Sequence, residues 1–218
     1  MEHLELVDRI YLEVKRMIFD QQLKPGQKLV QEKLSEELGV SRSPLLKALQ
    51  RLESEFLVER IPRRGMYVKR MTEKEVVDVF QCRAVIEGLS ARLATGVIDP
   101  AGIDELRGYF RPFQGQESIE VFAYAEADRS FHTRIMQWSG NAVILRLEVL
   151  SNIHLKAYQA GLLRPPERTL PEHFAIIEAM ARGDGTLAEQ LMRAHIERSI
   201  EALLSDKGER RFIGPAKQ

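Results

Sequence analysis

Apolar residues recur every three or four positions through most of residues 72–204, and this spacing restricts that part of the chain to helices. The breaks between the periodic segments contain glycine or proline. No alternation typical of strands interrupts the pattern. We therefore expect an all-α bundle of six or seven helices in residues 72–207, followed by a polar, frayed tail at 208–218. The helices are predicted at about 75–95, 101–113, 117–138, 141–162, 170–182 and 186–204.

Residues 1–71 show a different pattern, in which short helices precede a hairpin. Amphipathic helices are predicted at 4–20, 30–38 and from about residue 43 to 55. Gly39 suits the position just past the second helix. Apolar and charged residues then alternate roughly over 57–70, around a basic tip at Pro62-Arg63-Arg64-Gly65. Two short helices joined by a tight turn and followed by a hairpin predict a winged helix-turn-helix, so the whole chain is expected to be mainly α.

Charge is segregated along the chain. Lys and Arg number 32, and so do Asp and Glu, which excludes a uniformly basic nucleic-acid-binding protein but not a basic patch. Residues 1–71 carry a net charge of +3, residues 72–218 a net of −3, and residues 41–70 alone a net of +5. Charge by itself would fit an ordinary solvated face. In the context of a helix-turn-helix it favours nucleic acid.

The cysteine content and the hydropathy pattern favour a cytoplasmic protein. Cys82 is the single cysteine, which excludes an internal disulfide and is too few for a cysteine metal site. A reducing cytoplasm fits that usage. No segment reaches 18 uncharged apolar residues, so we expect no membrane span. The charged start of the chain is unlike a signal peptide.

The predicted helix-turn-helix supplies a set of candidate DNA contacts. Such domains present the first residues of the second helix to base edges in the major groove. Arg42 could bond guanine or a phosphate, and the basic hairpin tip could enter the adjacent minor groove, where Gly65 allows close approach. A winged helix used only for protein contacts is the alternative. The candidates are Arg42, Ser43, Pro44, Lys47, Arg51, Arg63, Arg64 and Gly65.

The spacing of one aspartate and three histidines predicts a metal site. Asp128 and His132 are four residues apart and share one helix face. His173 and His195 lie on inward-facing stripes, each 11 residues from the predicted turn at Asp184. Positions equidistant from the turn of an antiparallel helix pair meet, so these two histidines should face each other. One Zn²⁺, Ni²⁺ or Mn²⁺ ion per chain would satisfy both. Buried, hydrogen-bonded histidines without a metal are the alternative.

Two stretches of the sequence resemble known families. The stretch at residues 29–68, LVQEKLSEELGVSRSPLLKALQRLESEFLVERIPRRGMYV, resembles the N-terminal domain of GntR-family transcription regulators, and the resemblance covers about residues 5–70. Residues 72–207 resemble the FCD ligand-binding domain of one GntR subfamily. In its metal-binding members the ligands match Asp128, His132, His173 and His195. The other matching stretches of that domain are Cys82–Glu87, Ser139–Asn141, Glu172-His173 and Met192–His195.

The chain departs from the family pattern at two places. Leu46-Lys47 stands where the family usually has Arg then Glu, and that Arg commonly touches DNA. Either Lys47 supplies the cationic contact or the DNA site differs. Phe56 stands where the family usually has Gly.

The resemblance implies a homodimer that binds a palindromic operator and responds to a small organic or sugar acid. A six-coordinate metal held by four protein groups keeps positions open for a carboxylate. Arg83 could clamp that carboxylate, or could instead pair with Glu87 one turn away. Arg134, Asn152 and Tyr158 could line the pocket. A metal-sensing regulator and a metalloenzyme are the alternatives, and we expect no enzyme because no motif such as HExxH occurs.

Overall fold

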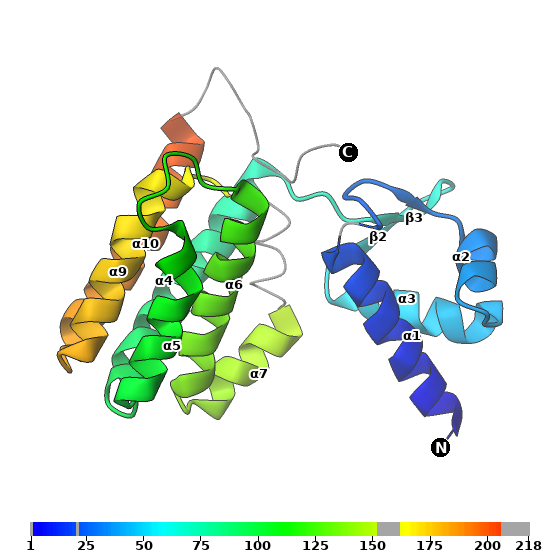
Figure 1. The fold of residues 1–218 in the computed structure, drawn as a ribbon. Coiled ribbons are helices and arrows are strands. Elements are labelled where there is room, and N and C mark those ends of the chain that lie inside the picture. Colours follow the sequence, from blue (N-terminus) through cyan, green and yellow to red (C-terminus); the bar gives the residue numbers. More distant parts are fainter. Residues whose placement is uncertain (1, 21, 152–161, 206–218) are drawn as a thin grey trace. The chain divides into compact units, whose positions relative to one another are not determined.

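The computed structural model describes residues 2–20, 22–151 and 162–205. The chain forms two compact units, one made mainly of residues up to Thr72 and the other mainly of residues from Glu73 onward. Helices dominate both units, as the sequence predicts, and the strands of the described residues belong to the first unit (Figure 1). Across these described ranges, no helix has the length and apolarity needed to cross a membrane.

Three helices and a three-stranded antiparallel sheet make up the first unit. The sheet has the order β1-β3-β2, with Leu29 opposite Met66 and Val58 opposite Val68. This is the predicted winged helix-turn-helix with one more strand, β1, whose two residues are too few to show an alternation in the sequence. The elements are α1 (Glu2–Phe19), β1 (Lys28–Leu29), α2 (Gln31–Glu37), α3 (Arg42–Ser54), β2 (Val58–Ile61) and β3 (Gly65–Val68).

The core of the first unit lies where α1 packs on α3. Val14 and Ile18 of α1 and Leu45 and Leu49 of α3 are completely buried. Each such side chain contributes roughly 1.5–3 kcal/mol by leaving water. The apolar spacing read from the sequence therefore marks the inner faces of both helices. It leaves the first turn of α3 and the tip of the hairpin free to carry charge.

Six α-helices and one 3-10 turn are described in the second unit. Among them, α10 packs against α4 along most of its length, and α9 and α10 form an antiparallel pair (Figure 1). The elements are α4 (Glu73–Thr95), α5 (Pro100–Phe110), the 3-10 turn η1 (Arg111–Phe113), α6 (Val121–Trp138), α7 (Ala142–Ser151), α9 (Pro166–Ala181) and α10 (Gly185–Ser205).

Proline and glycine account for several differences between predicted and observed boundaries. The helix predicted to reach residue 113 ends at Phe110 and continues as a 3-10 turn, because Pro112 has no N–H to donate. α9 begins at Pro166, four residues earlier than predicted, since proline is favoured in the first turn of a helix. The predicted helix 141–162 is described only from Ala142 to Ser151. Residues 152–161 of it and the predicted tail at 208–218 lie outside the described residues, and Leu162 is not helical.

A glycine allows α4 and α10 to approach closely. A Cβ atom added at Gly88 of α4 would lie 2.5 Å from Cγ of Arg193 on α10. Real Cβ atoms do not come that close to another heavy atom, so any side chain at position 88 would displace Arg193 or separate the two helices.

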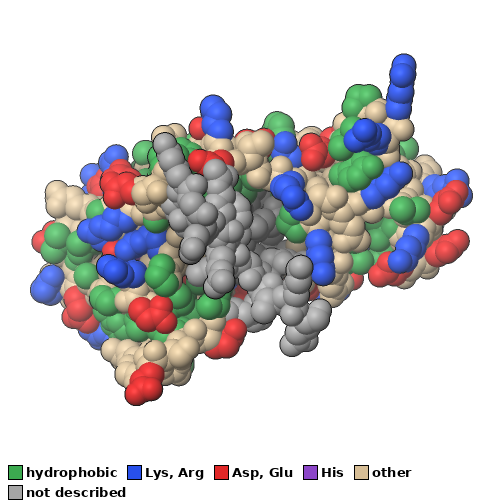
Figure 2. Space-filling model, turned by 90° about the horizontal axis from the view of Figure 1, so that it is seen from above, with side chains coloured by type: hydrophobic (Ala, Val, Ile, Leu, Met, Phe, Trp, Pro, Cys, Tyr) green, Lys and Arg blue, Asp and Glu red, His purple; other side chains and the backbone are tan. Residues whose placement is uncertain are grey.

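Charged side chains of both signs are interspersed on the outer surface shown in Figure 2, in keeping with the zero net charge.

Phe56 ends α3 in a backbone conformation that favours glycine. Its φ angle is 58°, and its side chain is 68% exposed. The Leu57 N–H donates to the Leu52 carbonyl and the Phe56 N–H donates to the Glu53 carbonyl, which is the bonding pattern of a Schellman cap. This geometry explains why glycine is usual at the position that Phe56 occupies.

We expect Phe56→Gly to stabilise the protein. Relief of the left-handed strain should raise the free energy of unfolding by about 1 kcal/mol, because the exposed ring contributes little burial. Urea unfolding of the full chain measures the change. Phe56→Ala is the matched control, since it removes the ring but keeps Cβ. An equal gain in both variants would show that the ring, and not the backbone angle, carries the strain.

Candidate functional site

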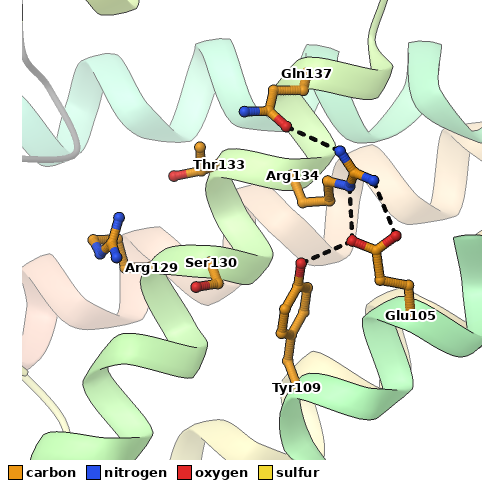
Figure 3. Close-up of a pocket in the computed structure, with 7 residues that line it drawn as sticks. All are labelled: Glu105, Tyr109, Arg129, Ser130, Thr133, Arg134 and Gln137. Carbon is orange, nitrogen blue, oxygen red and sulfur yellow. Dashed lines mark hydrogen bonds and ion pairs between the residues drawn. The ribbon is translucent and has the colours of Figure 1, made fainter.

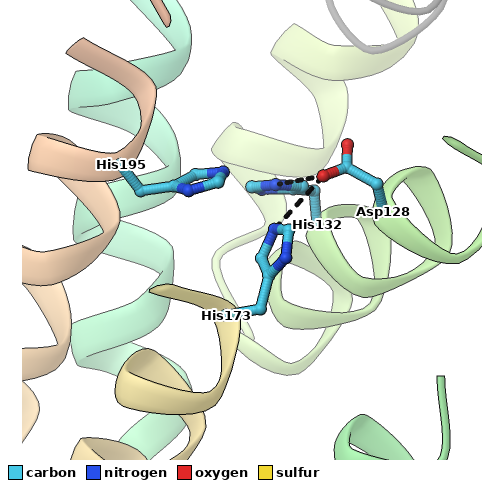
Figure 4. A group of neighbouring side chains, drawn as sticks. All are labelled: Asp128, His132, His173 and His195. Carbon is cyan, nitrogen blue, oxygen red and sulfur yellow. Dashed lines mark ion pairs between the residues drawn. The ribbon is translucent and has the colours of Figure 1, made fainter. Parts of the chain in front are cut away.

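Four side chains from three helices converge inside the second unit. Asp128 and His132 come from α6, His173 from α9 and His195 from α10 (Figure 4). One ligand atom from each residue lies within 4.8 Å of the ligand atoms of the other three. All three histidines are buried, and the Asp128 side chain is 20% exposed. We call these four residues the histidine cluster.

The contacts within the histidine cluster follow from the helix geometry. His173 and His195 meet across the α9–α10 pair with ring centroids 4.5 Å apart, as their equal distance from Asp184 predicts. The rings of His132 and His195 stack at 5.4 Å. Asp128 Oδ1 lies 3.2 Å from His173 Nε2 and 3.7 Å from His132 Nε2 (Figure 4). The structure therefore brings together all four residues that the sequence singles out.

Each histidine of the cluster turns its other ring nitrogen, Nδ1, outward to a different partner. His132 Nδ1 bonds the Glu87 carboxylate on α4. His195 Nδ1 lies 2.8 Å from Glu172 Oε2 on α9. His173 Nδ1 lies 3.0 Å from the hydroxyl of Tyr124 on α6, and its ring stacks on Phe110 at 4.2 Å. These outer contacts leave Nε2 of His132 and His173 directed at Asp128.

Burial and neighbouring charges set the protonation of the cluster. Burial and the nearby His195 lower the pKa of His173 to about 3. Burial also lowers the pKa of His195, against the opposing hydrogen bond from Glu172. The pKa of Asp128 would rise on burial, but His132 holds it well below its usual range. Two neutral imidazoles beside an ionised carboxylate are the protonation states that a divalent cation requires.

His132 differs from the other two histidines in its electrostatic surroundings. Burial acts to lower its pKa, but the charges of Glu87 and Asp128 outweigh burial and raise it. In the absence of a metal, His132 therefore supplies the positive charge that balances two carboxylates. The donor set of three imidazole nitrogens and one carboxylate oxygen fits Zn²⁺, Ni²⁺ or Mn²⁺.

The residues that hold the histidines are only partly visible in the sequence. Glu87 stands out as a possible partner of Arg83, but its bond to His132 joins two different helices, and the two residues are 45 positions apart in the chain. Glu172 precedes His173 directly, yet it bonds His195 instead. Tyr124 carries no signal beyond one helical turn of spacing from Asp128. Of these three residues, Glu172 could have been found from the sequence, by extending the antiparallel pairing of the two last helices to the inward-facing stripe that contains His195.

Among the predicted effector contacts, Arg83 and Arg134 lie in the described residues and both are ion-paired. Arg83 is buried, and its Nε donates to Glu87 Oε1 at 2.6 Å, so the predicted pair one turn apart is present. Arg134 lies two residues after His132 and points to another side of α6. Its guanidinium binds the Glu105 carboxylate at 2.8 and 3.0 Å. Asn152 and Tyr158 lie outside the described residues.

Arg134 lines a groove that is separate from the histidine cluster. The groove runs between α5 and α6, has a volume of about 370 Å³ and includes no residue of the cluster (Figure 3). Arg134 therefore does not border the space around Asp128. The lining residues are Glu105, Tyr109, Arg129, Ser130, Thr133, Arg134 and Gln137.

The first turn of α3 and the hairpin tip present most of the predicted DNA contacts to solvent. Arg42 is two-thirds exposed and donates to Glu32 Oε1 of α2 at 2.7 Å. Ser43 and Lys47 are exposed as well. At the hairpin tip, Arg63, Arg64 and Gly65 are exposed. Both segments therefore present exposed cations, as the predicted DNA contacts require.

Two predicted DNA contacts are used inside the first unit. Pro44 is buried at the start of α3, so it packs in the core instead of facing a base. Arg51 donates to Asp8 of α1 at 2.7 Å, and its guanidinium lies 3.8 Å from the ring centroid of Tyr11. Arg51 therefore holds α1 against α3, although it remains 46% exposed.

Comparison with known proteins assigns both units. Residues 6–68 match the family described as bacterial regulatory proteins, gntR family, and residues 78–198 match the FCD domain. An uncharacterized HTH-type transcriptional regulator of Streptomyces ambofaciens is 30% identical over 190 residues, which are 86% of this chain and 80% of that one. A probable D-xylose utilization operon transcriptional repressor of Paenarthrobacter nicotinovorans is 25% identical, over 80% of this chain and 78% of that one.

A solved structure has the same fold. The E. coli protein McbR/YncC superposes with a TM-score of 0.73 and 20% identity, over 93% of this chain and 99% of that one. At this identity the likeness concerns the arrangement of helices and strands in both units.

We expect Glu87→Ala to destabilise the second unit strongly. The substitution removes the carboxylate that forms a buried ion pair with the Arg83 guanidinium. Breaking a buried pair in this way lowers the free energy of unfolding by about 3–5 kcal/mol. Glu178→Ala is the control, because it breaks an ion pair with Arg107 that is exposed to solvent, at a cost of less than about 1 kcal/mol. Urea unfolding of both metal-free variants tests the difference. Equal losses would contradict the assignment of Glu87 as a buried ion-pair partner.

Proposed function

Because this chain belongs to the GntR family of bacterial regulatory proteins and carries an FCD domain, we propose that this DNA-binding transcriptional regulator holds one divalent metal ion at its histidine cluster. In this proposal the metal and its surroundings bind a small organic or sugar acid. A homodimer binds a palindromic operator in the cytoplasm, and the acid changes its affinity for that operator.

The convergence of the histidine cluster is the observation that carries the metal proposal. Three buried imidazoles and one carboxylate have ligand atoms within 4.8 Å of one another. Such a set of polar groups is costly to bury without a shared partner. A Zn²⁺, Ni²⁺ or Mn²⁺ ion would bind to Asp128, His132, His173 and His195, and it would supply a positive centre to which a carboxylate can bind.

Charge favours an acid as the effector. A divalent ion and the Asp128 carboxylate together leave one net positive charge at the centre. Arg83 remains a candidate clamp for a carboxylate in this proposal, because a guanidinium is a planar fork that can bind a carboxylate through two hydrogen bonds. Asn152 and Tyr158 remain candidates of the same proposal. The name of the P. nicotinovorans relative associates that protein with a sugar-utilization operon, which is in keeping with a small-molecule signal.

In this proposal the operator contacts come from exposed residues at the start of α3 and at the hairpin tip. Arg42, Ser43 and Lys47 would face the major groove, and the hairpin tip would contact the adjacent minor groove. Arg63 has a φ angle of 62°, a conformation in which glycine or asparagine is favoured. An arginine held there at an energetic cost supports a role for its side chain outside the fold.

Regulation follows from linkage. An acid that binds one arrangement of the DNA-binding units better than another shifts the population toward that arrangement. The acid and the operator then change each other's affinity by the same factor, about 5–150-fold in typical cases. A regulator that senses the metal itself uses the same scheme with the ion as signal. It would be favoured by a metal that exchanges readily and changes operator affinity without any acid.

We expect Arg42→Ala to abolish sequence-specific DNA binding. DNA fragments are selected on the wild-type protein and footprinted at two salt concentrations, and the variant should lose the protected, two-fold symmetric site. Weak binding that falls steeply with salt would remain, because other cations still contact phosphates. Arg16→Ala on α1 is the control, since Arg16 pairs with Glu13 and Asp20. An unchanged footprint with Arg42→Ala would contradict the assignment.

We expect His195→Ala to lose the metal. Elemental analysis after dialysis against a weak chelator should show about one divalent ion per wild-type chain and little in the variant, because three remaining ligands bind more weakly. Arg193→Ala, two residues earlier on the same helix, controls for handling of the protein. Full metal occupancy in His195→Ala would contradict the ligand set. A wild-type protein that takes up no Zn²⁺, Ni²⁺ or Mn²⁺ would contradict the metal site.

A further inference from the structure

The three histidines of the cluster are held from outside by three residues on neighbouring helices. We infer that Glu87, Glu172 and Tyr124 are positioning residues that fix each histidine in the tautomer whose Nε2 lone pair can bind a metal. We call them the anchor residues. The inference rests on the proposed function of the cluster as a metal site, which it extends from the ligands to the groups behind them.

Glu172 can act on His195 only as an acceptor. The guanidinium groups of Arg164 and Arg198 surround the Glu172 carboxylate and hold it in the ionised form. Arg164 contacts both carboxylate oxygens, at 2.7 and 2.8 Å, and Arg198 contacts Oε1 at 2.7 Å. An ionised carboxylate has no proton to give, so His195 Nδ1 must carry the hydrogen. In a neutral imidazole Nε2 is then a bare lone pair.

Glu87 imposes the same choice on His132. One of its oxygens accepts from Arg83 and the other faces His132 Nδ1. The buried guanidinium keeps the carboxylate ionised, so Nδ1 of His132 remains the protonated nitrogen whether or not Nε2 holds a second proton. A metal ion therefore has only the Nε2 proton to displace.

A chain of hydroxyl groups fixes His173. Thr169 Oγ1 donates to the Pro166 carbonyl at 3.3 Å, and a carbonyl can only accept. The Tyr124 hydroxyl lies 2.8 Å from Thr169 Oγ1 and must donate its single hydrogen there. It is left to accept from His173 Nδ1 at 3.0 Å. The chain thus runs from His173 to Pro166 and favours the hydrogen on Nδ1, against the pull of Asp128 Oδ1, which lies 3.2 Å from Nε2.

The result is a site that is set for a cation before the cation arrives. All three histidines keep their hydrogen on Nδ1 and direct Nε2 into the cluster beside the Asp128 carboxylate, where only His132 has an Nε2 proton to release, so binding requires no change of tautomer. Outer groups of this kind typically alter metal affinity about 10–100-fold when they are replaced. Two anchor residues are carboxylates, which also make Nε2 of the histidines they contact a more basic metal ligand. Tyr124 is neutral, and it acts only by fixing which ring nitrogen of His173 carries the hydrogen.

Glu172→Gln is the sharpest test, because it reverses the hydrogen bond instead of merely removing it. The two arginines should retain the amide oxygen at the Oε1 position, which turns the NH₂ group toward His195. Facing a donor, His195 should move its hydrogen from Nδ1 to Nε2 and so block the metal. NMR of the histidine ring nitrogens in the metal-free protein reads the tautomer directly. Competition with a chromophoric chelator gives the Zn²⁺ affinity.

Two further variants complete the test. Glu189→Gln is the matched control, since Glu189 also lies in a half-buried ion pair, with Arg92 at 2.9 Å, but contacts no histidine of the cluster. Tyr124→Phe keeps the ring and removes the hydroxyl that directs His173. We expect Glu172→Gln to bind Zn²⁺ about 10–100-fold more weakly with a changed His195 tautomer, Tyr124→Phe to show a smaller loss and a changed His173 tautomer, and Glu189→Gln to match the wild type.

The two readouts separate this inference from the metal proposal. If wild-type protein binds no Zn²⁺, the metal proposal fails, and the tautomers of the metal-free protein still decide whether the anchor residues direct the histidines. If wild-type protein binds Zn²⁺ and both variants keep wild-type tautomers and affinities, the inference is overturned while the metal site stands. Should Glu172→Gln fail to fold, Tyr124→Phe gives the same decision at His173.

Discussion

The close packing of α10 on α4 is the contact on which the second unit depends. Gly88 permits it, because any side chain there would collide with Arg193. The neighbouring residue on α4, Glu87, bonds a histidine of α6, and α10 carries His195 into the same space. A bundle with these helices farther apart would still bury apolar surface. It would not bring imidazoles from three helices into contact.

The first unit combines an apolar core with two strained backbone positions. Its core is apolar, and the basic side chains predicted to contact DNA are exposed at the start of α3 and at the hairpin tip. Two non-glycine residues, Phe56 and Arg63, have positive φ angles, one at the end of α3 and one in the hairpin. Local backbone strain of this kind persists only where the surrounding packing determines the conformation. The unit is thus slightly less stable than it would be with glycine at these two positions, and in return it carries a side chain at each of them.

Periodicity and turn chemistry were sufficient to predict most of the fold and the histidine cluster. The helices follow the apolar spacing, and symmetry about Asp184 predicts that His173 meets His195. The strand β1 escapes prediction because two residues carry no period. Glu172 and Tyr124 escape it because their partners lie across helix interfaces, where the angle between helices decides which side chains meet. Arg134 lies at a separate groove for a related reason, since two residues along α6 change the side it faces.

The solvent access of the cluster has a consequence for kinetics. The three histidines are almost completely enclosed, whereas the Asp128 side chain is 20% exposed. An ion held there would leave past Asp128 or through a transient opening of the bundle, and such openings have free energies of their own. Release would then be governed by the frequency of these openings. A tightly enclosed ion would exchange slowly, whereas an acid at the accessible side would bind and dissociate many times in the same period. The metal bound to a chain would then reflect the ions available when it was loaded and not those present later.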